Sequence, residues 1–520
     1  MYVRAGILTS EIGSRYGESP ALTFEGETET FRTLDLAANR AGSGLTAIGV
    51  SAGSVVGVLA YNSAEVVHVW LGCERAGLVR VTLHSHFEME THVTLLQEVG
   101  ATALVFDSRF SDAVDAHREN LAGMALIAIG DNPPDWATSW SEVTAKGSDG
   151  ELFLDANEAD PVFLQPTTGT TGKPKPWIVT HRSWAAIVNQ NLHHLDTFST
   201  DLPSVGPNDV MLHVHALQWA TGFQLLYPFI VRGARTVLMD DSEFDPEALA
   251  QTLVDEGVTA LLLPAPMLTP LLDLIEAKGG IDHKLNRLVI FFATPELLVR
   301  TSEVLGDVWC HGFGSTEQGA ATTRLLSSEV AVNADRLASV GRAASPFFEV
   351  AIVDHTGSRL PAGEVGEIVV RSAMSTSSYW DLPERTENAY FAHNWFRPED
   401  VGYLDADGFL YYVDRAGDSI STPHGTVYPH AVEGAVLRHD AVANVGVVGL
   451  SNGEIVAAVQ LKPGFIDSVE LRREIESAGS AGLKPHELPT VLIVEELPTV
   501  LGGAKVQRGV LREALEEQRR

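Results

Sequence analysis

Residues 163–181 read FLQPTTGTTGKPKPWIVTH and join two strand-like segments through a run of threonine, glycine and lysine. Glycines let backbone N–H groups approach a ligand closely, threonine hydroxyls add donors, and a lysine adds positive charge. The pattern therefore predicts a loop that holds a polyphosphate, with a flexible surface loop as the alternative. It differs from the Walker motif in its glycine spacing and in having Pro174 at the Ser/Thr position. The predicted phosphate ligands are Thr167, Thr168, Gly169, Thr170, Thr171, Gly172 and Lys173.

The composition is that of a globular protein of two to four domains, with 520 residues and a net charge of −32. No Lys/Arg-rich block offsets the acidic excess, so nucleic acid and anionic lipid are not expected as partners. The two cysteines are too few for a disulfide framework and predict a reducing, cytoplasmic location. The most apolar stretch, residues 260–275, contains three prolines, so we expect no membrane span.

Short apolar runs alternate with helical patterns through most of the chain. Buried strands are expected at residues 55–60 and 79–83, with a helix at 64–76 between them, and this alternation predicts an α/β fold with mostly parallel sheet. From residue 350 onward, short strands separated by glycine turns predict a small β-rich subdomain. The last hundred or so residues predict a compact α+β unit, with the boundary at residues 415–418.

Two histidines, His84 and His86, follow the strand expected at residues 79–83. A metal site is one interpretation, but alternate residues at a strand end face opposite ways. We therefore predict that His84-Ser85-His86 is a surface turn.

A second motif, HGFGSTE, occupies residues 311–317. The glycines on either side of Phe313 permit close backbone approach and leave a ring face free for stacking. Thr316 supplies a hydroxyl donor, and Glu317 supplies a carboxylate oxygen of the kind that Mg²⁺ prefers. A tight capped turn is the alternative, but the position downstream of the predicted phosphate loop favours a binding role.

Three further charged groups fit a nucleotide-dependent reaction. Asp400, in WFRPEDVGY at residues 395–403, can accept hydrogen bonds from both hydroxyls of a ribose, and Arg415 follows in the next charged segment. Lys505 follows a glycine-rich segment, from which a lysine can enter a cleft and stabilise charge that develops in a transition state.

In order and spacing, these segments resemble the AMP-forming adenylating enzymes, which include acyl-CoA synthetases, stand-alone adenylation domains and luciferases. The resemblance covers roughly residues 10–515 and implies that ATP and Mg²⁺ are bound. The roles that it implies are adenine stacking by Phe313 beside Gly314, an α-phosphate contact by Thr316, Mg²⁺ binding by Glu317 and Thr168, ribose binding by Asp400, a ribose or phosphate contact by Arg415, and catalysis by Lys505, Thr316 and Glu317.

The chain departs from the family pattern at four places. Residues 398–400 read PED where the family has Thr-Gly-Asp, and Gly417 occupies the position of the family's hinge Lys or Asp. Residues 422–425 read TPHG where a Ser-Gly-Gly segment helps to build the thiol channel, and Ala504 lies between the glycines and the lysine. Proline fixes φ and removes an N–H donor, so the surface that receives the thiol is expected to differ.

The resemblance also implies a division of the chain. We expect an α/β N-terminal domain at residues 1–415, made of mixed, mostly parallel sheets and helices, with a small β subdomain at about 345–415. A small, mobile α+β C-terminal domain at residues 416–520 is expected to carry the catalytic lysine.

The predicted acid pocket is the segment at residues 213–229, which contains no Asp or Glu. An α-amino acid is therefore disfavoured, because its buried ammonium group would lack a partner. Aromatic side chains favour a planar aryl or a modest acyl acid, and core packing is the alternative role for them. The predicted pocket residues are Gln218, Trp219, Gly222, Phe223 and Phe292.

The predicted function is activation of a small acid as its AMP ester, with release of pyrophosphate and transfer to a thiol of CoA or of a carrier-protein phosphopantetheine. The alternatives are an adenylating enzyme with an amine acceptor, or one that activates nitrite for an aryl amine. A non-catalytic adenylate-binding protein is a third reading, which the presence of Glu317 and Lys505 disfavours.

Overall fold

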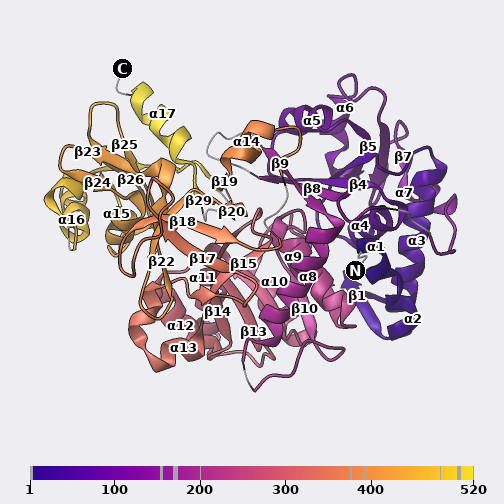
Figure 1. The fold of residues 1–520 in the computed structure, drawn as a ribbon, viewed down its shortest axis with the longest axis horizontal. Helices are drawn as coiled ribbons and strands as arrows, with labels where there is room; N and C mark the ends of the chain where they lie inside the picture. The colour runs from indigo at the N-terminus through magenta and orange to yellow at the C-terminus, as the bar shows by residue number, and fades with distance from the viewer. Residues whose placement is uncertain are drawn as a thin grey trace.

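The structure is a computed structural model that describes residues 4–152, 156–167, 174–199, 201–374, 378–391, 394–480, 482–500 and 505–518. Two large sheets and their helices form most of the molecule, and a smaller unit built from the last part of the chain lies beside them (Figure 1). The mixed α/β class predicted from the sequence is confirmed. Within the described ranges, no helix is both long and apolar enough to cross a membrane.

The first large sheet has seven strands in the order β7-β6-β5-β3-β4-β8-β9. Its strands are parallel except for β8 and β9, which form an antiparallel hairpin. Strands β3 and β4 are buried along their whole length, which explains why they are continuous apolar runs in the sequence. The strands are β3 (Val55–Leu59), β4 (Val79–Leu83), β5 (Ala101–Asp107), β6 (Ala125–Ile129), β7 (Thr138–Ser139), β8 (Pro161–Thr167) and β9 (Lys175–Thr180), with helices α1 (Ala5–Ser10), α2 (Ile12–Tyr16), α3 (Phe31–Ala47), α4 (Ala64–Ala76), α5 (Met89–Glu98), α6 (Ser111–Asp115) and α7 (Trp140–Ala145).

The second large sheet has nine strands in the order β16-β15-β14-β13-β12-β10-β11-β1-β2. Its middle strands are parallel, and β2, β15 and β16 pair antiparallel at its two ends. The strands are β1 (Pro20–Phe24), β2 (Glu27–Thr30), β10 (Val210–His213), β11 (Arg235–Leu238), β12 (Ala260–Pro264), β13 (Arg287–Phe291), β14 (Trp309–Ser315), β15 (Ala320–Leu326) and β16 (Arg342–Ala343), with helices α10 (Pro246–Asp255), α11 (Ala265–Ala277), α12 (Pro295–Leu305) and α13 (Ser327–Val332).

Helices α8 (His181–Asp196) and α9 (Ala220–Val231) pack against each other and contact strands of both sheets. Trp184 of α8 and Tyr227 of α9 meet nearly edge to face, with ring centroids 5.0 Å apart. Residues of both sheets and both helices share one hydrophobic core. The two sheets are thereby held in a fixed relation, and the hairpin β8–β9 is anchored in the same core through Phe163 and Trp177.

The remaining chain forms a six-stranded β unit followed by the C-terminal unit, which is coloured orange to yellow at the left of Figure 1. The C-terminal unit has its own hydrophobic clusters around a three-stranded sheet, β25-β26-β27. The elements of the β unit are β17 (Glu349–Val353), β18 (Gly366–Arg371), α14 (Pro383–Asn388), β19 (Tyr390–Phe391), β20 (Trp395–Phe396), β21 (Asp400–Leu404) and β22 (Leu410–Arg415); those of the C-terminal unit are β23 (Ile420–Thr422), β24 (Gly425–Val427), α15 (Pro429–Val436), β25 (Val442–Gly449), β26 (Ile455–Leu461), α16 (Val469–Gly479), β27 (Thr490–Val494), β28 (Thr499–Val500), β29 (Lys505–Val506) and α17 (Arg508–Gln518).

Candidate functional site

The predicted phosphate loop connects the ends of the β8–β9 hairpin. Thr167 and Lys175 are paired at the loop end of this hairpin, and the Thr167 hydroxyl donates a hydrogen bond to the Lys175 carbonyl at 3.2 Å. The other predicted phosphate ligands, Thr168, Gly169, Thr170, Thr171, Gly172 and Lys173, lie outside the described residues. The hairpin itself is well defined, since Trp177 is buried and packs on Tyr379.

The predicted adenine motif lies on β14 and in the turn that connects it to β15. Phe313 is half-buried, with its ring 5.8 Å from the ring of Tyr412 on β22. Gly314 pairs with Ala321 across the hairpin, and a β-bulge separates this pair from that of Phe313. Thr316 and Glu317 follow in the turn and are half-buried. The motif therefore presents one aromatic face and two oxygen-bearing side chains from a single turn.

Glu317 is held by a hydrogen bond from outside its own hairpin. The Tyr379 hydroxyl donates to Glu317 Oε1 at 2.9 Å, and the Tyr379 ring packs edge-on against Trp177 at 5.0 Å. Burial, followed by the Glu317 carboxylate, raises the pKa of Tyr379, so the phenol stays protonated and remains a donor. The position of the Glu317 carboxylate thus depends on the β8–β9 hairpin.

A single oriented carboxylate fits Mg²⁺ bound together with a nucleotide, because Mg²⁺ usually takes one or two protein carboxylates plus phosphate and water oxygens. The described part of the chain contains no cluster of three or more His, Cys, Asp or Glu side chains that forms a protein-only metal site. The Glu317 carboxylate supplies a hard oxygen ligand beside the β8–β9 hairpin. The residues present therefore fit Mg²⁺, the metal that the family resemblance implies.

Asp400 and Arg415 are paired across β21 and β22. Their side chains form an ion pair with a 3.1 Å separation, and the Asp400 side chain is only 7% exposed. The Asp400 carboxylate is the main cause of the raised pKa of Arg415, and Glu317 contributes in the same direction. Asp400, Arg415 and Glu317 therefore lie in one electrostatic neighbourhood, although they come from two different sheets.

Asp414, one residue before Arg415, is buried at the start of the C-terminal unit. It accepts hydrogen bonds from the backbone N–H groups of Arg415 and His430, each at 2.7 Å. Arg508 lies 3.8 Å from Asp414 and bonds both oxygens of Glu433. Arg508 begins α17, directly after the strand that carries Lys505, so these contacts fix that part of the chain relative to β22.

Only the backbone of Lys505 is described. It pairs with Val500 in the short hairpin β28–β29, and the residues before it, 501–504, lie outside the description. Gly417 lies in a short 3₁₀ turn between β22 and β23, where a Cβ atom would meet nothing within 4 Å. The assignment of catalysis to Lys505 stays a prediction.

The predicted acid-pocket residues separate into three environments. Gln218 and Trp219 lie between β10 and α9, and the Trp219 ring stacks on His84 at 3.9 Å. Phe223 is buried against Phe163, and Gly222 is tightly packed, since a Cβ atom there would lie 2.1 Å from the Leu217 carbonyl.

The fifth predicted pocket residue, Phe292, is 54% exposed and has a positive φ of 63°. Its neighbour Phe291 lies against Gly312 instead, with ring atoms 3.3 Å from where a Cβ atom would stand. The aromatic residue that faces the adenine motif is therefore Phe291.

The surface turn predicted at residues 84–86 is wrong for its first member. His84 is 1% exposed, whereas His86 is exposed, so the two rings do face opposite ways. Trp219, which lies between β10 and α9, covers His84, and this contact explains the burial. Burial lowers the pKa of His84 to about 3, so the ring is neutral.

Two further histidines were missed by sequence reasoning, namely the buried His213 at the end of β10 and the half-buried His215 just after it. Their rings lie 6.1 Å apart, and burial lowers the pKa of His215 to about 4. His215 Nε2 lies 2.9 Å from the Thr221 hydroxyl, and neither ring nitrogen of His213 has a partner within the described residues. The signal in the sequence was the position of histidines at the carboxyl ends of parallel strands, where ligands bind in open α/β sheets.

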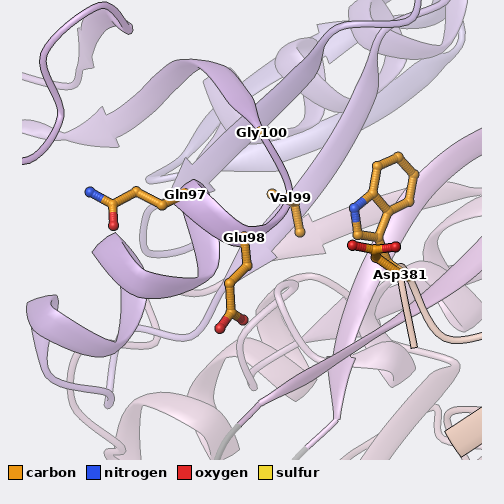
Figure 2. Close-up of a pocket in the computed structure, with 6 residues that line it drawn as sticks. Gln97, Glu98, Val99, Gly100 and Asp381 are labelled. Carbon is orange, nitrogen blue, oxygen red and sulfur yellow. The ribbon is translucent and has the colours of Figure 1, made fainter. Parts of the chain in front are cut away.

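A shallow depression lies away from these residues, between the end of α5 and the segment after Tyr379 (Figure 2). Gln97, Glu98, Val99 and Gly100 line one side, and Asp381 lies opposite. None of the predicted site residues lines it, so we assign no function to it.

Comparison with known proteins agrees with this geometry. The family described as AMP-binding enzyme matches residues 10–380, and its C-terminal domain matches residues 431–501. The chain therefore belongs to the AMP-binding enzyme family and is an AMP-forming ligase.

Among its relatives, the chain is 28% identical to the 2-succinylbenzoate–CoA ligase of Bacillus cereus, over 96% of both chains. It is also 28% identical to the indoleacetate–CoA ligase of Aromatoleum aromaticum, again over 96% of both. The solved structure of an anthranilate CoA ligase in complex with anthranoyl-AMP has a TM-score of 0.89 and 24% identity, covering 100% of this chain and 98% of that one. An amide bond synthetase from Marinactinospora thermotolerans has a TM-score of 0.85 and 24% identity, covering 98% and 99%, so the fold is shared.

Proposed function

We propose that this protein uses ATP to convert a small aryl or acyl carboxylic acid into its AMP ester, and then transfers the acyl group to the thiol of CoA. The observation that carries the proposal is the convergence of Glu317, Asp400 and Arg415 beside the β8–β9 hairpin. The CoA ligase relatives that align over nearly the full chain support a thiol as the acceptor.

In the first step, a carboxylate oxygen of the acid attacks the α-phosphorus, the new P–O bond forms, and the bond to the β-phosphate bridging oxygen breaks. Asp400 holds the ribose, Phe313 stacks on the base, and Thr316 contacts the α-phosphate. Lys505 stabilises the negative charge that develops during this displacement, and no protein nucleophile is required. Mg²⁺ bound by Glu317 and Thr168 would neutralise phosphate charge. In the second step, the thiol sulfur attacks the acyl carbon and AMP leaves.

The aryl preference is supported by the environment of the acid segment. Trp219 stacks on His84 with ring centroids 3.9 Å apart and an interplanar angle of 21°, which makes a flat aromatic platform. His84 is neutral, so the stacked pair is uncharged and suits contact with an apolar aryl ring. We further propose a cytoplasmic location, and a role for Lys505 on a C-terminal domain of residues 416–520 that changes its orientation between the two steps.

The test is pyrophosphate release with ATP, Mg²⁺ and a panel of aryl and acyl acids, followed by mass spectrometry of products formed with CoA, amines or a carrier protein. We expect acid-dependent pyrophosphate release and an acyl-CoA product. Lys505→Ala should abolish pyrophosphate release, and Lys462→Ala, which changes an exposed lysine in the same unit, should not. An amide product with no thioester would move the chain to the amine-acceptor class. Near-normal release by Lys505→Ala would contradict the catalytic assignment.

A further inference from the structure

Glu399 has a backbone conformation that side-chain-bearing residues rarely adopt. Its φ is 65°, in the left-handed region that favours glycine. It stands immediately before Asp400, at the position where the resembled family has glycine in its Thr-Gly-Asp triplet. The Glu399 carbonyl accepts a hydrogen bond from the Ala416 N–H at 2.8 Å, which pins this strained residue to the start of the C-terminal unit. Backbone strain of this kind clusters at functional sites, so it motivates the hypothesis that the Glu399 side chain has a role there.

The Glu399 side chain is paired with a residue of α14. Arg385 Nη1 donates to Glu399 Oε1 at 2.7 Å, and this hydrogen bond is the largest cause of the raised pKa of Arg385. The guanidinium carbon also lies 5.5 Å from the centre of the Tyr379 ring, and Tyr379 further raises the pKa of Arg385. Glu399 therefore fixes a cation against the tyrosine that holds Glu317.

The contacts form one continuous chain, from Glu399 to Arg385, then to Tyr379, and then to the Glu317 carboxylate. Lys175 lies within reach of the same groups. Burial and Arg385 lower the pKa of Lys175, whereas Glu399 and Glu317 oppose that shift. Two carboxylates thus balance two cations at the loop end of the β8–β9 hairpin.

We propose that Glu399 and Arg385 are positioning residues that orient Glu317, through the Tyr379 hydroxyl, toward the metal-bound nucleotide. This inference rests on the proposed function, because it assigns a nucleotide and Mg²⁺ to that site. Groups that hold a metal ligand in place commonly change metal affinity about 10- to 100-fold when they are removed. Where the family pattern has glycine, this chain has a glutamate whose side chain holds Arg385.

A positioning role and a purely structural role predict opposite results for Glu399→Gly. Glycine relieves the left-handed backbone strain, so the variant should be at least as stable as the wild type. The same substitution releases Arg385, so the binding of Mg²⁺ with nucleotide should weaken. Tyr379→Phe removes only the hydroxyl, and it should reproduce the weaker binding. Arg371→Ala breaks the Arg371–Glu349 pair of the same β unit and serves as the matched control.

The experiment is calorimetric binding of α,β-methylene-ATP, which cannot release pyrophosphate, over a series of Mg²⁺ concentrations, with thermal unfolding of each variant alongside. We expect Glu399→Gly, Arg385→Ala and Tyr379→Phe each to need about tenfold more Mg²⁺ for half-maximal binding, with Arg371→Ala unchanged. Wild-type Mg²⁺ dependence in Glu399→Gly would overturn the inference and leave the proposed function standing. Absence of nucleotide binding by the wild type would overturn both.

Discussion

Replacing Arg508 with methionine should selectively destabilise the C-terminal unit. The Arg508 side chain is 14% exposed and pairs with three carboxylates. It donates hydrogen bonds of 3.1 and 2.6 Å to Glu433 and of 2.8 Å to Asp418, and it lies 3.8 Å from Asp414. Removing one partner of a buried ion pair costs about 3 to 5 kcal/mol, and the network is nearly enclosed, so we expect about 4 kcal/mol at neutral pH. Methionine keeps most of the aliphatic packing, which assigns the loss to the charge.

The loss of stability in Arg508→Met should depend on pH, because the carboxylates that Arg508 no longer pairs with can take up protons. Burial already raises the pKa of Asp414 in the presence of Arg508, and without the cation the shift should grow. A group whose folded-state pKa is raised contributes stability below its unfolded pKa, and that contribution is lost as the pH rises through the folded pKa. The Arg508→Met defect should therefore be larger at about pH 7.5 than at about pH 5.5.

Hydrogen exchange of α17 and of the β25–β26 strands measures the opening free energy of this unit directly, without assuming that the whole chain unfolds in one step. Arg473→Met, which changes an exposed arginine on α16, is the control and should show wild-type protection. An opening free energy within about 1 kcal/mol of the wild type at pH 7.5, or an equal defect at both pH values, would refute the ionic account of this junction.

Four other substitutions test separate parts of the structure. Burial raises the pKa of Asp241 to about 6, so its contribution to stability is present below the ordinary value of 3.8 and is lost as the pH rises through 6. Asp241→Asn should therefore gain about 1 kcal/mol over the wild type at pH 7.5 and nothing near pH 4 in thermal unfolding; an equal gain at both pH values would contradict this. Gly341→Ala should lower Tm, with a loss of at least about 2 kcal/mol, because φ is +82° and the new Cβ would lie 1.8 Å from Arg324 backbone atoms. Gly417→Ala should leave Tm unchanged, because its Cβ would meet nothing within 4 Å, and similar Tm values for both glycine variants would show that the steric argument fails. Asp400→Asn should raise the KM for ATP in the pyrophosphate assay about tenfold, and an unchanged KM would remove Asp400 from the ribose site.

Strands and helices could be predicted from the sequence where their burial requires a recognisable pattern of apolar residues. Residues 55–60 and 79–83 are continuous apolar runs because the strands they form are covered on both faces. Helix α11 begins at Ala265 with Pro266 in its first turn, a position that proline fits, so a proline in this stretch does not end the helix. The hydrophobic pattern therefore predicts where the helices and strands lie. Where each one begins and ends depends on its tertiary contacts and on which residues fit its first and last turns.

Of the candidate site, the sequence predicts only the residues that belong to motifs, and it does not predict the contacts that support them. Glu317, Asp400 and Arg415 belong to short segments whose residue types indicate the chemistry, and the structure brings them together. The Tyr379–Glu317 hydrogen bond joins residues 62 positions apart, and the Arg385–Glu399 pair joins residues 14 positions apart, so no local pattern indicates them. The burial of His84 has the same origin, because Trp219, 135 positions further along the chain and just before α9, covers it.

We propose that the resistance of the junction between β22 and the C-terminal unit to a reorientation of Lys505 is electrostatic and not steric. Gly417 faces open space, so the backbone there can rotate without a clash. Asp414, in contrast, is fully buried and accepts hydrogen bonds from the N–H groups of Arg415 and His430. A rotation that moves His430 away leaves a buried carboxylate short of one donor, and an unmade hydrogen bond to a buried charged group is costly. We therefore propose that the free-energy cost of turning the C-terminal unit is set by how Asp414 is re-solvated, and that Gly417 only permits the movement.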